Sequence, residues 1–280
     1  MSLSWANLMP VNHLLVFLST NKVAVINRSL GLGSRVADQK QVTFQGSIES
    51  VEMQAPAWQK ATVELESIFS AMQIKPGTRL NMTLASEFVR YLSLPPLQIR
   101  MNAAEKLAYV SAAYQDVYGS TVNNWEIKLH DAPANEATLA AAIDKKLVTE
   151  INQIALKHQL ILNSIQPFLM RAFNALASQI GNTSAYLVIV ESKRLLLINL
   201  QNGKYQHLRT YAIDGNWQSE LKNLIQREAL LADSDKREVL IYAPAQKSTG
   251  FNVIDGWQLK RISTLKNVIT DTQYSMLEVA

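Results

Sequence analysis

Side chains that could transfer protons or hold a metal are few and widely spaced in this sequence of 280 residues. Histidine serves both purposes near neutral pH, but no histidine here has a neighbour at the spacing of a metal site. The four lie at His13, His130, His158 and His207. His158 falls near the end of a predicted helix, where interaction with the helix dipole is the expected role. No cysteine is present, which excludes disulfides, thiolate metal sites and cysteine nucleophiles.

Charged groups cluster in three places, and each cluster has an ordinary structural explanation. Asp131, Glu136 and Asp144 fall in loops and at a helix start, which favour acidic residues in any protein. The pairs Lys145–Lys146 and Lys193–Arg194 are more typical of solvated faces than of phosphate clamps. The Gly-x-Ser-x-Gly motif of a hydrolase elbow does not occur. The residues alone therefore show no machinery of an enzyme.

The composition is that of a globular protein. Hydrophobic residues make up 48% and charged residues 18%, and the length suits one large domain or two similar halves. A net charge of +4 is too small and too scattered to indicate nucleic-acid binding. The longest apolar run near the start, residues 14–18, is far shorter than the ~20 residues of a transmembrane helix. No secretory signal is recognisable, so the expected location is the cytoplasm.

The stretch from Ala137 to Leu176 predicts the architecture most clearly. Two short apolar runs of strand length alternate with two segments whose apolar residues recur at helical spacing. Asp144 is placed to cap the first of these helices, and Pro167 suits the first turn of the second. Strands without polar alternation are typical of a sheet covered on both faces. The sequence therefore predicts a mixed α/β fold.

The other predicted elements form two similar series. The first has strands at 14–19, 22–29 and 42–46, a helix at 56–72 and a strand at 79–86. A short helix capped by Ser86, a long helix at 102–118 and a strand at 125–130 follow. The second has strands at 186–192, 194–203 and 205–213, a helix at 216–231, and strands at 238–244 and 256–262. Asn202–Gly203 is a strong hairpin turn signal within it.

Residues 14–83 and 185–243 thus share one order of elements, strand-strand-strand-helix-strand, which indicates an internal repeat. Two such halves are the plan of the duplicated ribonuclease-H-like, or actin-like ATPase, fold. We place the first half, with an inserted helix and strands, at 1–145 and the second at 146–280. The alternative is an unrelated mixed α/β chain that happens to contain two meanders.

Several short motifs resemble a known family. The most specific has the pattern Leu84, Ser86, Phe88, Arg90, Tyr91, Leu94 and Pro95. Supporting pieces are Tyr118–Gly119, Trp125, the run LAAAID, and LILNSIQPFLMRAFN at 160–174. Over roughly residues 14–245 the chain resembles the actin-like proteins of bacterial pilus and secretion machines. These are the PilM-like type IV pilus assembly proteins, the MshI-type pilus proteins and the cytoplasmic domain of type II secretion L proteins.

The resemblance implies a nucleotide site, and the sequence departs from the family pattern there. Actin-like ATPases hold phosphates with two hairpins that begin Asp-x-Gly, and no such triplet occurs in this chain. The polar candidates left are Ser19, Thr20 and Lys22 in the first hairpin and Glu191 and Ser192 in the second. The expected adenosine loop offers only Gly250. We therefore expect no ATP or Mg²⁺ cofactor and no ATPase activity. The alternative is an active actin-like ATPase or a sugar-kinase-like enzyme.

A binding role is what the resemblance implies instead. Proteins of this family capture the short cytoplasmic segment of a membrane-anchored assembly partner in a groove, and they also dock on one another. We expect such a scaffold to lie in the cytoplasm, held at the inner membrane only through its partner. Arg90 and Tyr91, in the most family-like stretch, are the candidate partner contacts. The alternative is that these two residues serve packing.

Overall fold

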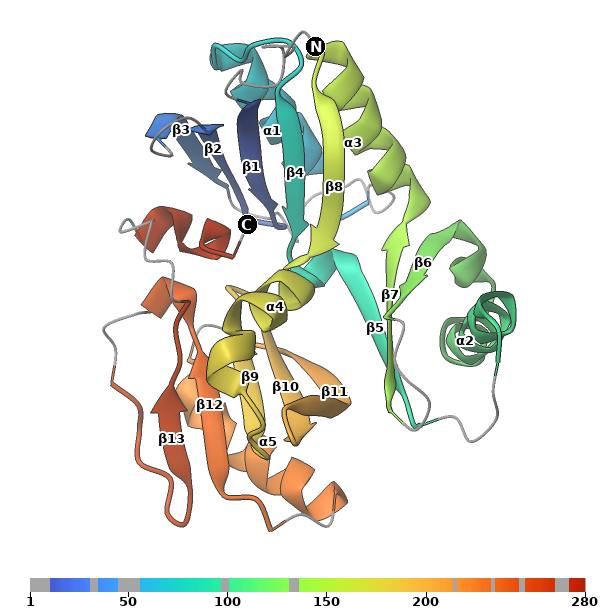
Figure 1. Ribbon diagram of the computed structural model, residues 1–280, viewed down its shortest axis with the longest axis vertical. Helices are drawn as coiled ribbons and strands as arrows, with labels where there is room; N and C mark the ends of the chain where they lie inside the picture. The colour runs from blue at the N-terminus through green and yellow to red at the C-terminus, as the bar shows by residue number, and fades with distance from the viewer. Residues whose placement is uncertain are drawn as a thin grey trace, which may run out of the picture.

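Two five-stranded sheets built from the same order of elements lie one above the other in Figure 1. The structure, a computed structural model, describes residues 11–30, 35–44, 56–96, 101–130, 136–213, 216–232, 235–246, 250–264 and 272–279. The first sheet has the strand order β3-β2-β1-β4-β8. Its elements are β1 (Val11–Leu18), β2 (Lys22–Leu30), β3 (Arg35–Thr43), α1 (Gln59–Ala71), β4 (Arg79–Leu84) and β8 (Ile161–Pro167). We call this sheet, together with α1 and α3 (Lys145–Lys157), the first lobe.

The second sheet repeats this plan in the order β11-β10-β9-β12-β13. Its elements are β9 (Tyr186–Val190), β10 (Arg194–Gln201), β11 (Lys204–Ala212), α5 (Trp217–Leu231), β12 (Glu238–Tyr242) and β13 (Gln258–Arg261). In both sheets three antiparallel strands precede a helix, and the next strand pairs parallel with the first. The predicted repeat is therefore confirmed. We call this sheet, together with α5, the second lobe.

The central strands are apolar along their length because both faces of each sheet are covered. Successive side chains of a strand point to opposite faces, so neighbouring residues enter different cores. Leu14 of β1 packs with α1 and α3, whereas Phe17 packs with α4 (Phe168–Ile180). Leu187 of β9 joins that same α4 core from the second lobe. Helix α4 thus lies between the two sheets and shares one core with both, as Figure 1 shows.

A third sheet lies beside the lobes and corrects one prediction. It has the order β5-β7-β6, made of β5 (Val89–Leu94), β7 (Thr138–Asp144) and β6 (Trp125–Leu129), and α2 (Ala103–Tyr118) packs on it. We call it the side sheet. The predicted short helix from Ser86 is wrong: Ser86–Phe88 form only a 3₁₀ turn, η2, and the chain continues as β5. Antiparallel pairing with β7 gives the backbone of β5 its hydrogen bonds, which overrides the helical spacing of its apolar residues.

Two local signals, one at a helix start and one in a hairpin turn, are confirmed. The Asp144 side chain accepts a hydrogen bond from the backbone N–H of Lys146 at 2.8 Å and caps α3. The β10–β11 hairpin turns through Asn202 and Gly203, at φ 52° and 74°. A Cβ atom on Gly203 would lie 1.8 Å from the carbonyl oxygen of Gly181, so only glycine fits there.

The division of the chain at residues 145 and 146 stays a prediction, and strand pairing weighs against that position. Both α3 and β8 follow it in sequence, yet β8 pairs with β4 in the first sheet. The first sheet therefore ends at Pro167, and α4 leads into the second.

None of the helices in the described ranges combines the length and the apolar character that a membrane span requires.

Candidate functional site

The two hairpins that the family resemblance singled out meet at one junction between the lobes. In the β1–β2 turn the Ser19 N–H donates to the Lys22 carbonyl at 2.9 Å, and in the β9–β10 turn the Glu191 N–H donates to Arg194 at 2.8 Å. Each hairpin therefore closes through a two-residue turn. The tips touch where Asn21 Oδ1 accepts from Ser192 Oγ at 3.4 Å. Ser19 Oγ donates to the same oxygen at 3.0 Å.

Glu191 makes the main polar contact across this junction. Its side chain is 4% exposed, and its carboxylate accepts hydrogen bonds from the Ser86 N–H at 2.9 Å and the Ser86 hydroxyl at 2.5 Å. Ser86 opens η2, directly after β4 of the first lobe. Burial raises the pKa of Glu191 to about 7, although the Ser86 bonds and Arg194 favour the ionised form. The contact joins two residues 105 positions apart in the chain.

A second carboxylate, Glu87, lies beside the first. The Thr20 hydroxyl donates to its Oε2, while its Oε1 has no hydrogen-bond partner in the described part of the chain. Burial raises the pKa of Glu87, and Thr20, Arg194 and Lys193 oppose that shift. A phosphate placed here would therefore meet two carboxylates in a poorly hydrated site, which electrostatics disfavours. Lys22 takes part through its backbone carbonyl, which accepts from Ser19.

All five predicted hairpin residues thus lie at this junction, and three contributors were missed. Asn21 supplies a hydrogen-bond acceptor, Ser86 supplies two donors, and Glu87 supplies a second acid. Sequence reasoning assigned Ser86 to a helix cap. A signal for its position did exist, because residues that follow parallel strands gather at one edge of a sheet, and Ser86 follows β4 beside β1.

The predicted partner contacts, Arg90 and Tyr91, occupy different environments. Tyr91 packs against the first lobe's core and against the α4 core that the lobes share, and its hydroxyl lies 3.2 Å from Ser86 Oγ. Burial and the nearby Glu191 raise its pKa well above the usual value. Arg90 is exposed, and its Nη1 donates to the Glu87 carbonyl at 3.1 Å. Its own carbonyl accepts from the Tyr114 hydroxyl at 2.7 Å.

A groove with a volume of about 290 Å³ separates the side sheet from the first lobe. One wall is Leu162–Ile165 of β8, a strand at the edge of its sheet. The opposite wall carries Glu126 and Lys128 of β6, which form an ion pair at 3.1 Å. Ile143 of β7 and Val148 and Asn152 of α3 complete the lining. The groove therefore combines apolar side chains with the edge of a strand.

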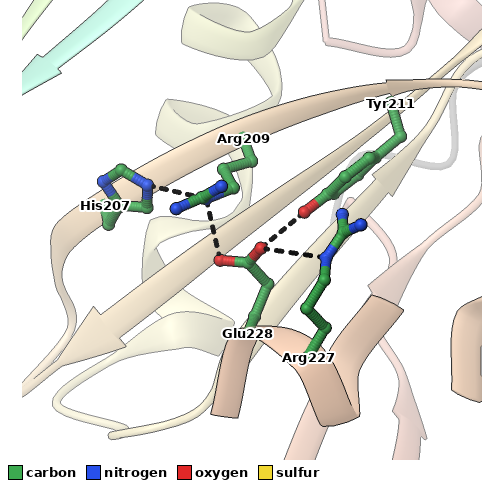
Figure 2. A network of polar contacts seen from close by, with 5 residues as sticks. All are labelled: His207, Arg209, Tyr211, Arg227 and Glu228. Atoms are coloured by element: carbon green, nitrogen blue, oxygen red, sulfur yellow. Dashed lines mark hydrogen bonds and ion pairs between the residues drawn. The ribbon is translucent and has the colours of Figure 1, made fainter. Parts of the chain in front are cut away.

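A separate polar cluster joins α5 to β11 in the second lobe (Figure 2). Glu228 of α5 is 6% exposed, accepts a hydrogen bond from the Tyr211 hydroxyl at 2.6 Å and forms an ion pair with Arg209 Nε at 3.1 Å. Arg227 approaches it at 4.0 Å and stacks over Tyr211. Arg209 Nε donates a hydrogen bond to His207 Nε2 at 3.1 Å, and His207 Nε2, as the acceptor, carries no proton. One buried acid paired by two arginines is a structural ion pair, and we assign it no chemistry.

Comparison with known proteins gives a likeness in structure only. No family model matches the sequence, and no curated protein does. A Bacteroides thetaiotaomicron protein with an actin-like ATPase fold and unknown function is 11% identical, with a TM-score of 0.60 and 100% of both chains covered. The cytoplasmic domain of EpsL, an inner membrane component of the type II secretion system of Vibrio cholerae, is 10% identical. Its TM-score is 0.58, with 95% of this chain and 92% of that one covered.

The PilM–PilN type IV pilus biogenesis complex is also similar. It is 11% identical, with a TM-score of 0.63 over 90% of this chain and 88% of that one. Identities this low carry information about the fold and not about the chemistry of a site. The predicted fold class is confirmed, and the likeness to pilus and secretion proteins is confirmed at the level of the fold. The chain has the actin-like ATPase fold.

Proposed function

We propose that this chain is a non-catalytic actin-like scaffold that binds the cytoplasmic segment of a membrane-anchored partner in a pilus or secretion assembly. The observation that carries the non-catalytic part is the junction. The two hairpin tips contact each other, and a buried carboxylate, Glu191, already occupies the donors of Ser86. Neither hairpin begins with Asp-x-Gly. These features favour a closed contact between lobes over a phosphate site.

The groove between β8 and β6 is where we place the partner. An edge strand leaves one row of backbone donors and acceptors open, and an extended peptide pairs with such a row. Leu162 and Ile165 on β8 and Val148 on α3 offer apolar contacts for alternate side chains of that peptide. Glu126 and Lys128 offer one charge of each sign. Strand β8, which forms one wall of the groove, pairs with β4. Strand β4 in turn leads into the stretch in which the partner contacts were predicted.

The comparisons support the class of partner. Two of the similar structures belong to assembly machines: one is a PilM–PilN biogenesis complex, the other the cytoplasmic domain of a secretion component of the inner membrane. A scaffold of this kind would be held at the membrane through its partner. Self-association, which the sequence resemblance also implies, is a further part of the proposal.

Calorimetric titration with Mg-ATP tests the non-catalytic part. We expect no dissociation constant tighter than about 0.1 mM, a free energy of roughly −5.5 kcal/mol, and no hydrolysis above background. A micromolar dissociation constant, or turnover, would restore the alternative of an active ATPase or kinase-like enzyme. Glu191→Ala is the informative variant there, because it removes the carboxylate that faces the phosphate position. Improved binding by that variant would identify Glu191 as the group that excludes nucleotide.

Peptide binding tests the partner part. The probes are fluorescent synthetic peptides, each the cytoplasmic segment of a single-span membrane protein encoded beside this chain. Val148→Arg places a long charged side chain in the groove, and Leu156→Arg makes the same change at a 75% exposed position of the same helix. We expect Val148→Arg to weaken binding at least tenfold at an unchanged melting temperature, and Leu156→Arg to bind like wild type. Equal binding by both variants, or binding of no peptide, would contradict the proposal.

A further inference from the structure

We propose that the Glu191–Ser86 contact is a proton-operated latch, which holds the two lobes together when Glu191 is protonated and loosens them when it is ionised. The contact crosses from the turn after β9 of the second lobe to the turn after β4 of the first. It therefore breaks when the lobes separate. This inference is independent of the partner and of the proposed lack of catalysis.

The bonds at the latch fit both protonation states, but the surroundings favour the neutral one. An ionised Glu191 accepts from the Ser86 N–H and hydroxyl. A protonated Glu191 keeps the N–H bond and donates its own proton to Ser86 Oγ, whose hydrogen then turns towards the Tyr91 oxygen 3.2 Å away. Burial of the side chain disfavours the charge, which is hydrated once the lobes open.

Three titratable or charged groups act on Glu191 from the elements around it, and a fourth acts on its neighbour Glu87. Glu87 on η2 repels the charge, the Tyr91 hydroxyl on β5 stays neutral, and Arg194 on β10 attracts it. Lys193 acts on Glu87. Desolvation is the largest effect and raises the pKa of Glu191 from 4.5 to about 7. Closing the lobes therefore takes up a proton near neutral pH.

The size of the effect follows from linkage. We take opening to return Glu191 to its ordinary pKa of 4.5. The ratio of closed to open molecules then falls as the pH rises from about 4.5 to about 7, the pKa of Glu191 in the closed state. Between pH 5.5 and 8 that fall amounts to roughly thirtyfold. Above pH 8 the ratio becomes flat, because Glu191 is then ionised in both states.

Spin-label distances measure this equilibrium directly, because the natural chain has no cysteine to remove. Val63→Cys on α1 and Leu230→Cys on α5 place one label on each lobe, at positions 61% and 82% exposed. We expect one narrow distance distribution at pH 5.5 and a broader, longer one at pH 8. An identical distribution at both pH values would overturn the proposal.

Glu191→Gln supplies the decisive variant. An amide cannot ionise, yet it accepts from the Ser86 N–H and donates to the Ser86 hydroxyl as a protonated carboxyl does. The variant should stay in the narrow distribution at both pH values. Glu228→Gln, which changes another buried acid away from the junction, should respond to pH like the labelled parent. A wild-type pH response in Glu191→Gln, or loss of the response in Glu228→Gln, would overturn the latch.

Ser86→Ala tests the latch without touching the acid. It removes the hydroxyl, keeps the backbone N–H, and should shift the population towards the longer distances at pH 5.5. An unchanged population at that pH would contradict the latch, because the hydroxyl contact would then contribute nothing to closure.

Discussion

The raised pKa of Glu191 gives the whole chain a pH-dependent stability. A carboxyl whose pKa rises on folding binds its proton more tightly in the folded state. Its stabilising contribution to the free energy of unfolding is therefore fully present below 4.5, the ordinary pKa of a glutamate. That contribution is lost as pH rises through about 7. The total change is about 3 kcal/mol of unfolding free energy.

Chemical denaturation at pH 5, 6, 7 and 8 measures this dependence. The free energy of unfolding should fall across the series, and the fall should be smaller by about 2.5 kcal/mol in Glu191→Gln. His13 and His207 have lowered pKa values, which favour stability at higher pH. Because Glu191→Gln keeps both histidines, the difference between the variant and wild type isolates the effect of Glu191. Parallel curves for the variant and wild type would show that Glu191 is not the titrating group.

Adjacent residues Arg90 and Tyr91 should behave differently when truncated. Tyr91 packs on the first lobe's core and on the shared α4 core and reaches Ser86, so Tyr91→Ala should cost about 2–4 kcal/mol of unfolding free energy. Arg90 is exposed, and Arg90→Ala should stay within about 0.5 kcal/mol of wild type. Urea denaturation measures both. Loss of peptide binding in the stable Arg90→Ala variant would restore the predicted partner contact at that residue.

At the scale of elements, sequence patterns predicted what local chemistry decides. Asp144 at its cap and Asn202–Gly203 in its hairpin need only their neighbours in the chain, and both are confirmed. The segment after Ser86 failed because its strand form depends on pairing with β7, about 50 residues further on. The candidate site likewise has a part that local sequence predicted and a part that depends on distant contacts. The hairpin residues were placed by motif, whereas the Glu191–Ser86 contact depends on how two distant lobes meet.

Glu228 makes the polar contacts that join helix α5 to strand β11, and their contribution is testable. Glu228→Gln keeps the shape but removes the charge that pairs with Arg209 and accepts from Tyr211. The expected loss is about 1.5–3 kcal/mol in urea denaturation, the range for hydrogen bonds to a charged group. Arg227→Gln is the matched change on the same helix, and it should cause a clearly smaller loss, because Arg227 is exposed, lies 4.0 Å from Glu228 and adds only its stacking over Tyr211. Equal losses in the two variants would assign the attachment to general charge effects.

At the scale of the molecule, a single core connects the lobes. Helix α4 and the C-terminal turn η5 (Thr272–Leu277) contribute to one cluster that also contains residues of β1, β2, β9, β10 and β12. The turn η5 contacts β1 and β2, and in Figure 1 it lies between the two sheets. The lobes therefore share packing energy, and we expect them to unfold together.

Leu277→Ala tests this shared core. Leu277 is 1% exposed, so the truncation should cost about 2–5 kcal/mol, and Leu230→Ala at an 82% exposed site should cost almost nothing. Hydrogen exchange followed by mass spectrometry can report on β4 and β12 separately, one strand from each sheet. If the core unites the lobes, exchange through global unfolding should accelerate by the same factor in both strands. Acceleration confined to one strand would mean that the lobes unfold independently and that η5 stabilises only its own side.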